Sequence, residues 1–178
     1  YPTCEVGALL ARAIPVRADS LTQLGPSTPA MLWLNSPSNP TGKVLGVDHL
    51  RKVVEWARDR GVLVVSDECY IELGWTDEEP VSILHPSVCG ASHEGLLAVH
   101  SLSKRSNLAG YRFGFVTGDA GVIASLLEVR KHSGFMVPMP VQAAAAVAYK
   151  DDSHVREQKE LYRARRDELS AALLGAGF

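Results

Sequence analysis

Short apolar runs that alternate with helical patterns are the feature that most limits the folds open to this chain. The run "VLVV" at 62–65 is rich in β-branched residues and unbroken, which is typical of a strand buried on both faces of a sheet. Just before it, Leu50, Val53 and Val54 recur at the spacing of one helical face. Strands that alternate with helices predict an α/β fold with a mostly parallel sheet sandwiched by helices.

The same patterns assign elements along the whole chain. Strands are predicted at 11–18, 30–35, 62–70, 96–101 and 111–118. Helices are predicted at 47–61, 119–132, 138–150 and 153–174, with a polar connection at 75–95. Asp48 and Asp119 are the expected caps of the first two of these helices. The composition changes near residue 150 from alanine-rich to charged, which indicates a boundary between residues 1–150 and a helix at 151–178.

Composition excludes several classes of partner. The formal net charge of −2 gives no electrostatic basis for binding nucleic acid or an anionic membrane. No apolar run approaches the roughly 18–20 residues of a membrane span. The three cysteines, Cys4, Cys69 and Cys89, form no disulfide framework or metal motif, so we expect reduced thiols in a cytoplasmic protein.

Polar clusters follow three of the predicted strands. They are "NSPSNPTG" after 30–34, "SDECY" after 62–65 and "SLSK" after 96–100. In open α/β sheets, ligands bind beyond the carboxyl ends of the strands. The three clusters are therefore expected to meet in one ligand site.

Two short motifs and the histidines suggest other chemistry. The "PTGK" sequence at 40–43 is typical of the end of a phosphate-binding P-loop, but Pro37 stands where that motif needs glycine and Val44 where it needs serine or threonine. Ser101 and Lys104 match the S-x-x-K motif of serine acyl-enzymes, but no S-D-N or K-T-G triplet accompanies them, and the glycines that follow indicate a loop. The six histidines lack ligand spacing, so no metal site is expected, although His100 lies close to the expected site.

The three polar clusters, in this order and at these spacings, resemble the class I/II aminotransferases, which are pyridoxal-phosphate enzymes of fold type I. The resemblance covers essentially the whole chain. It implies that residues 1–150 are part of the cofactor-binding large domain and that residues 151–178 lead toward a small domain that the chain lacks. It also implies pyridoxal 5'-phosphate as cofactor, amino acid and 2-oxo acid substrates that bind in turn, and a homodimer.

The resemblance also implies a role for individual residues. Lys104 would bind the cofactor aldehyde covalently and move a proton as a neutral amine, which desolvation at a strand end favours. Asp67 would pair with the pyridine nitrogen, while Tyr70 and Asn39 would bind the phenolic oxygen of the ring.

The remaining expected ligands belong to the cofactor phosphate. Arg112, predicted inside a strand, would clamp the phosphate with its planar guanidinium. Ser101 and Ser103 would donate hydroxyl hydrogens to the same group, although alternate residues of a strand face opposite ways.

The resemblance leaves parts of the site and the substrate open. A phosphate-cradling turn, a ring-stacking residue and an arginine for the substrate carboxylate are expected outside this sequence, so we expect the chain to be a piece of a longer protein. The segment 132–169 is similar to bacterial succinyldiaminopimelate aminotransferases of lysine biosynthesis. Alternatives are another fold type I enzyme, such as a lyase, decarboxylase or oxoamine synthase, and a non-catalytic fragment.

Overall fold

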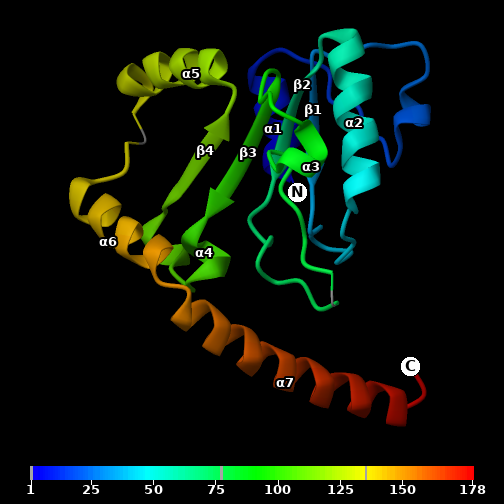
Figure 1. The fold of residues 1–178 in the computed structure, drawn as a ribbon, viewed down its shortest axis with the longest axis vertical. Helices are drawn as coiled ribbons and strands as arrows, with labels where there is room; N and C mark the ends of the chain where they lie inside the picture. Colours follow the sequence, from blue (N-terminus) through cyan, green and yellow to red (C-terminus); the bar gives the residue numbers. More distant parts are fainter. Residues whose placement is uncertain (1, 77, 135) are drawn as a thin grey trace.

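The computed structural model, which describes residues 2–76, 78–134 and 136–178, is built around one four-stranded sheet (Figure 1). Its strands are β1 (Met31–Asn35), β2 (Leu63–Asp67), β3 (Leu96–Ser101) and β4 (Gly114–Gly118). They lie in the order β1-β2-β3-β4; the first three are parallel, and β4 runs antiparallel to β3. The predicted α/β fold with a mostly parallel sheet is confirmed.

Helices and loops connect and flank the strands. The α-helices are α1 (Pro2–Leu10), α2 (Val47–Arg60), α3 (Pro86–Cys89), α4 (Leu102–Arg105), α5 (Ala120–Ser133), α6 (Met139–Lys150) and α7 (Ser153–Gly175). Two 3-10 turns, η1 (Leu21–Leu24) and η2 (Ala109–Tyr111), lie between them. None of the helices in the described ranges is both long enough and apolar enough to span a membrane.

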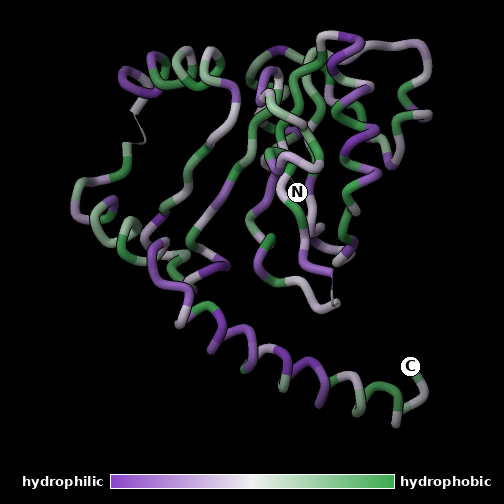
Figure 2. Tube along the Cα trace, in the orientation of Figure 1, coloured by the Kyte–Doolittle hydropathy of each residue, from purple (hydrophilic) through white to green (hydrophobic). Residues whose placement is uncertain are grey.

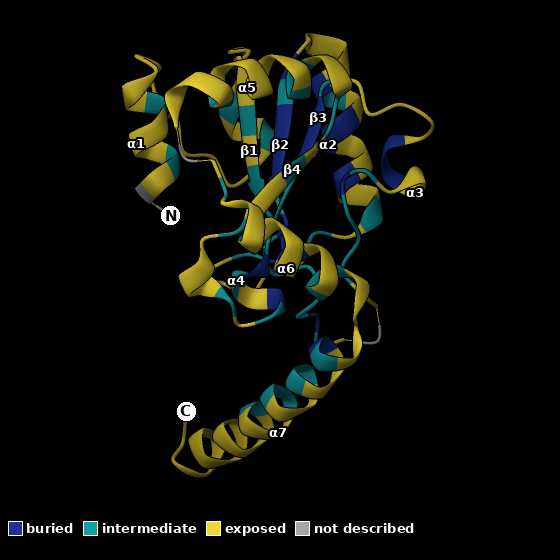
Figure 3. Ribbon diagram, turned by 90° about the vertical axis from the view of Figure 1, so that its left-hand side faces the viewer, coloured by how far each residue is buried: buried dark blue, intermediate teal, exposed yellow. Residues whose placement is uncertain are grey.

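The hydrophobic core lies between the sheet and helices α2 and α3. Four residues of α2 that share one face are each 1% exposed: Leu50, Val53, Val54 and Ala57. They pack with strand residues such as Val64 and Leu96, and each large aliphatic side chain buried in this way contributes about 1.5–3 kcal/mol. Figure 3 shows the buried residues concentrated in β2, β3 and the inner face of α2, with α1 on the other side of the sheet.

The ends of α2 and α5 follow their local sequences. Gly61 adopts a left-handed conformation (φ 64°), which ends α2 at little steric cost. Asp119 caps α5 as predicted, because its carboxylate accepts the backbone N–H groups of Gly121 and Val122. Asp48 does not cap α2; Gly46 occupies that position, and Asp48 lies in the first turn.

Four sequence expectations about the elements are corrected. The segment 11–18 is irregular rather than a strand; its apolar residues Ile14 and Val16 are 87% and 69% exposed, so the alternation has no buried face. Strand β2 ends at Asp67 rather than at residue 70, and β4 begins at Gly114 rather than at residue 111. The short helix α3 interrupts the connection expected at 75–95.

Helix α7 leaves the sheet and carries the chain away from the core (Figure 1). Its first part is hydrophilic and its last part is hydrophobic (Figure 2). The break between α6, which ends at Lys150, and α7, which begins at Ser153, coincides with the predicted change in composition.

Candidate functional site

Backbone pairing brings the first two polar clusters to one edge of the sheet. Asn35 and Asp67 lie opposite each other as the last residues of β1 and β2. The Asn35 side chain donates to the Asp67 carbonyl (3.3 Å) and accepts from the Asn39 backbone N–H (2.8 Å). Asn35 therefore ties the loop that carries Asn39 to the strand that carries Asp67, a role that its place at a strand end could have suggested.

The half-buried Asp67 carboxylate and the Lys104 ammonium both influence the pKa of the Cys69 thiol. Asp67 Oδ1 accepts the backbone N–H of Cys69 (3.2 Å). Burial raises the pKa of the Cys69 thiol to about 12, with further contributions from the hydrogen bond and charge of Asp67, while the charge of Lys104 lowers it. Both charges are thus close to Cys69. The sequence predicted that Cys69 lies on a strand, but β2 ends at Asp67, two residues before it.

Lys104 lies on the single-turn helix α4 and not in the loop that its glycine-rich surroundings indicated. The turn forms because the Ser101 hydroxyl accepts the Ser103 backbone N–H at 3.1 Å, which caps it. Lys104 Nζ lies 5.5 Å from the centre of the Tyr70 ring. Lys104 is exposed, so this chain's own side chains do not supply the desolvation expected from the sequence.

Ser101 and Ser103 lie side by side, because the helical turn cancels the alternation expected of a strand. Their hydroxyl oxygens are 2.9 Å apart, and Ser101 also donates to the Phe113 carbonyl (3.1 Å). The structure thus brings two of the three predicted phosphate ligands together, and the second of them, Ser103, directly precedes Lys104.

Arg112 differs from its expected place inside a strand. It follows η2 in a left-handed conformation (φ 54°), is exposed, and donates through Nη1 to the Ala109 carbonyl at 3.0 Å. No contact joins it to Ser101 or Ser103 in the described part of the chain. Its exposure leaves the guanidinium accessible to an anion.

His100 points to the core side of the sheet and away from the predicted ligands. Its Nε2 atom lies 3.5 Å from Oε2 of Glu68, a carboxylate that is only 2% exposed. Glu68 Oε1 accepts the backbone N–H of Ile83 (2.8 Å). This buried acid was missed in the sequence, where it is one of several acidic residues.

The family model described as Aminotransferase class I and II matches residues 16–178. The chain belongs to this family. It is 69% identical over its whole length to a probable aminotransferase of Mycobacterium tuberculosis and 58% identical to the 4-dedimethylamino-4-oxo-anhydrotetracycline transaminase of Streptomyces rimosus. The chain covers 42% and 49% of these two proteins, so it spans about half the length of the curated aminotransferases it matches.

Solved aminotransferase structures share the fold. A probable N-succinyldiaminopimelate aminotransferase of Thermus thermophilus is 30% identical with a TM-score of 0.81, over 98% of this chain and 50% of that one. The N-succinyldiaminopimelate aminotransferase of Mycobacterium tuberculosis is 26% identical with a TM-score of 0.81, over 96% of this chain and 47% of that one. The sheet therefore corresponds to part of the large domain of fold type I.

The side chains at the strand ends suit pyridoxal phosphate, the cofactor of class I and II aminotransferases. The cofactor offers an aldehyde, a basic ring nitrogen, a phenolic oxygen and a phosphate. Against these groups, the structure sets an accessible amine at Lys104, a half-buried carboxylate at Asp67 and a phenol at Tyr70. The adjacent hydroxyls of Ser101 and Ser103 complete the set with donors for the phosphate.

Proposed function

We propose that the protein containing this chain is a pyridoxal-phosphate-dependent aminotransferase that moves an amino group from an amino acid to a 2-oxo acid, binding the two in turn. The observation that carries the proposal is the meeting of Lys104 and Tyr70 above the end of the sheet, beside Asp67. Family membership and the fold of the solved relatives support it.

Each of these residues has a defined task in the proposal. When bound, pyridoxal phosphate withdraws electrons from the substrate α-carbon. Lys104 Nζ holds the cofactor covalently and afterwards carries a proton at that nitrogen, as a general base and acid. The Asp67 carboxylate keeps a proton on the ring nitrogen, because a negative charge favours the positive partner.

The other ligands orient the ring. The Tyr70 hydroxyl and the Asn39 side chain donate to the phenolic oxygen. The hydroxyls of Ser101 and Ser103 donate to the phosphate, for which the Ser101 O–H must leave Ser103 and the Phe113 carbonyl, and the exposed guanidinium of Arg112 closes on the same group. Because Arg112 sits on a left-handed residue outside β4, the proposal requires its side chain to leave the Ala109 carbonyl.

We also propose a specific amino donor. The similarity of 132–169 to succinyldiaminopimelate aminotransferases, and the solved relatives that carry this name, lead us to propose N-succinyldiaminopimelate as donor, in lysine biosynthesis. The relative with 58% identity has a name that specifies another substrate, so a panel of donors is required.

The test is a product assay on the complete protein. Each amino donor is supplied with 2-oxoglutarate and pyridoxal phosphate, and the 2-oxo acid product, glutamate and carbon dioxide are measured. The proposal predicts equal amounts of oxo acid and glutamate with no carbon dioxide. Carbon dioxide or an elimination product without glutamate would show a decarboxylase or lyase instead. The same assay on the 178-residue chain decides whether this piece is active alone.

We further propose a cytoplasmic homodimer in which residues 1–150 belong to the large domain and 151–178 lead toward a small domain. The unpaired state of all three cysteines supports a reducing compartment. Sedimentation analysis of the complete protein tests the dimer, which would have twice the mass of one chain.

A further inference from the structure

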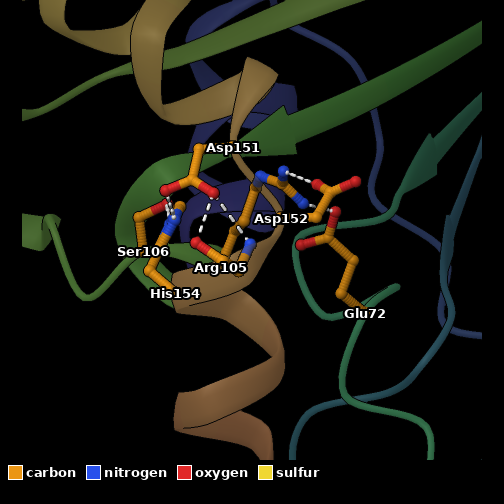
Figure 4. A network of polar contacts seen from close by, with 7 residues as sticks. Glu72, Arg105, Ser106, Asp151, Asp152 and His154 are labelled. Carbon is orange, nitrogen blue, oxygen red and sulfur yellow. Dashed lines mark hydrogen bonds and ion pairs between the residues drawn. The ribbon is translucent and has the colours of Figure 1, made fainter.

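Arg105, the residue after Lys104, is a buried cation between two carboxylates from distant parts of the chain. It is 8% exposed. Its Nη1 atom donates to Glu72, in the loop after β2, and its Nη2 atom donates to Asp152, immediately before α7 (Figure 4). These partners lie 33 and 47 residues away in sequence, so Arg105 joins three separate segments at the base of α4.

The guanidinium plane is also held by an aromatic ring. The centre of the Arg105 guanidinium lies 5.1 Å from the centre of the Tyr149 ring, which packs in turn against Phe113 and Phe115. Burial lowers the pKa of Arg105, but the hydrogen bond to Asp152 and the charge of Glu72 outweigh it, so the pKa is raised. The cation is thus fixed by two ion pairs and one stacking contact.

A small polar cavity lies beside Arg105. Among the described residues, three buried side-chain atoms have no hydrogen-bond partner in the protein: Glu68 Oε2, Arg105 Nε and Tyr149 Oη. All three residues line one cavity of about 10 Å³, which is room for roughly one water molecule. Buried polar atoms need partners, and this cavity is polar and large enough for one water molecule that contacts them.

Two further hydrogen bonds tie the segment after Lys104 to α7. The Ser106 hydroxyl lies 2.8 Å from His154 Nε2, and the Tyr162 hydroxyl donates to Asn107 Oδ1 (2.9 Å). The N-terminal half of α7 therefore contacts three consecutive residues beyond Lys104, either directly or through Asp152.

We propose that Arg105 is a positioning residue: its clamp on Glu72 and Asp152 fixes the turn that presents Lys104, and through it the start of α7 sets the position of the lysine. The consequence for turnover rests on the proposed aminotransferase function. The clamp itself is a property of the fold and can be tested without any cofactor.

The variants separate the clamp from a general loss of folding. Arg105→Met removes both ion pairs, and Arg105→Lys keeps the charge but cannot bridge two carboxylates with a planar fork. Asp152→Asn weakens one arm at a residue whose side chain is 64% exposed, so the fold should survive. Arg163→Met and Asp167→Asn are matched controls, because Arg163 pairs with Glu160 and Asp167 pairs with Arg166, both within α7 and away from Arg105.

In the complete protein with pyridoxal phosphate, we expect Arg105→Met to lower kcat about 10- to 100-fold with KM changed less than about threefold, because the lysine is displaced and substrate contacts are kept. The visible circular dichroism of the bound cofactor should change in Arg105→Met and Asp152→Asn, and Arg105→Lys should recover part of kcat. Unchanged kcat and dichroism in folded Arg105→Met would overturn the proposal. A control variant that lowers kcat and changes the dichroism as much as Arg105→Met would also overturn it.

Hydrogen exchange without cofactor completes the test. In Asp152→Asn, the backbone amides of 102–108 should exchange about fivefold faster than in the unchanged protein, with the core amides of β2 unaffected. Faster exchange would support the clamp even if the protein bound no pyridoxal phosphate, which would refute only the proposed function. Unchanged exchange in Asp152→Asn, or an Arg105→Met protein that fails to fold while Asp152→Asn behaves as the original, would overturn it.

Discussion

Lys104 Nζ lies 5.5 Å from the centre of the Tyr70 ring, across the carboxyl ends of β3 and β2. A cation over an aromatic face at an exposed site contributes about 0.5–1 kcal/mol. The contact is therefore strong enough to bias the direction of the lysine but weak enough to yield to a ligand. It places an amine and a phenol where the sequence motifs predicted them to meet.

Asp67 provides the first prediction. Asp67→Ala should retain part of the bound cofactor, because Lys104 and the two serines are unchanged, but turnover should fall by about 100-fold or more. Asp67→Asn keeps an acceptor for the Cys69 N–H and removes only the charge. Steady-state kinetics should show a similar loss in both variants; near-normal turnover in either would mean that the charge of Asp67 serves the fold alone.

The Cys69 thiol reports the electrostatics of the site in the absence of cofactor. Its pKa is raised to about 12 by burial first and then by Asp67, which predicts about a thousandfold less thiolate at pH 8 than for an ordinary cysteine. Alkylation by iodoacetamide at pH 8, followed by mass spectrometry, should be very slow at Cys69 and faster in Asp67→Asn. Rapid alkylation of the folded protein, at the rate found in urea, would contradict this.

Gly118 should not tolerate a side chain. Its φ is 136°, and an added Cβ would lie 2.1 Å from the Leu96 carbonyl oxygen. We expect Gly118→Ala to lower the free energy of unfolding by about 2–4 kcal/mol, because both strain and overpacking apply. Gly175→Ala, in a helix with open space around it, is the control and should be neutral or slightly stabilising. Urea unfolding of both variants measures the difference, and equal midpoints would refute the expected clash.

Asp119 predicts a pH dependence of stability. Backbone N–H groups of Gly95, Val122 and Gly121 hold the pKa of its carboxyl below the ordinary 3.8. A lowered pKa in the folded state stabilises the fold above about pH 3.8, and this contribution is lost as the pH falls through the folded value. Asp119→Ala should therefore be less stable than the unchanged protein at pH 7, with a smaller gap at pH 2.5. An equal gap at both pH values would show that the charge is not involved.

The sequence located the strands and the polar residues that follow them better than the exact position of each side chain, for physical reasons. Hydrophobic periodicity located β1, β2, β3 and α2, because burial of one face determines both pattern and packing. It failed at 11–18, where apolar residues alternate without a face to bury. The position of Arg112 depends on a left-handed residue after a 3-10 turn, which a strand-like pattern conceals.

The ion pairs of Arg105 could not be predicted from the sequence. Its partners Glu72 and Asp152 are distant in sequence and are ordinary acidic residues in their own segments. Only the packing of α4 against the loop after β2 and the start of α7 brings these charges together. The motif residues, by contrast, stand at strand ends that topology alone places side by side.

Covalent trapping of the cofactor tests the central claim most directly. The complete protein is incubated with pyridoxal phosphate, reduced with borohydride, digested and analysed by mass spectrometry. We predict one modified peptide with the cofactor on Lys104, and loss of both the label and the visible absorption band in Lys104→Ala. A label on another lysine, or a band retained in Lys104→Ala, would contradict the assignment of this residue as the one that holds the cofactor.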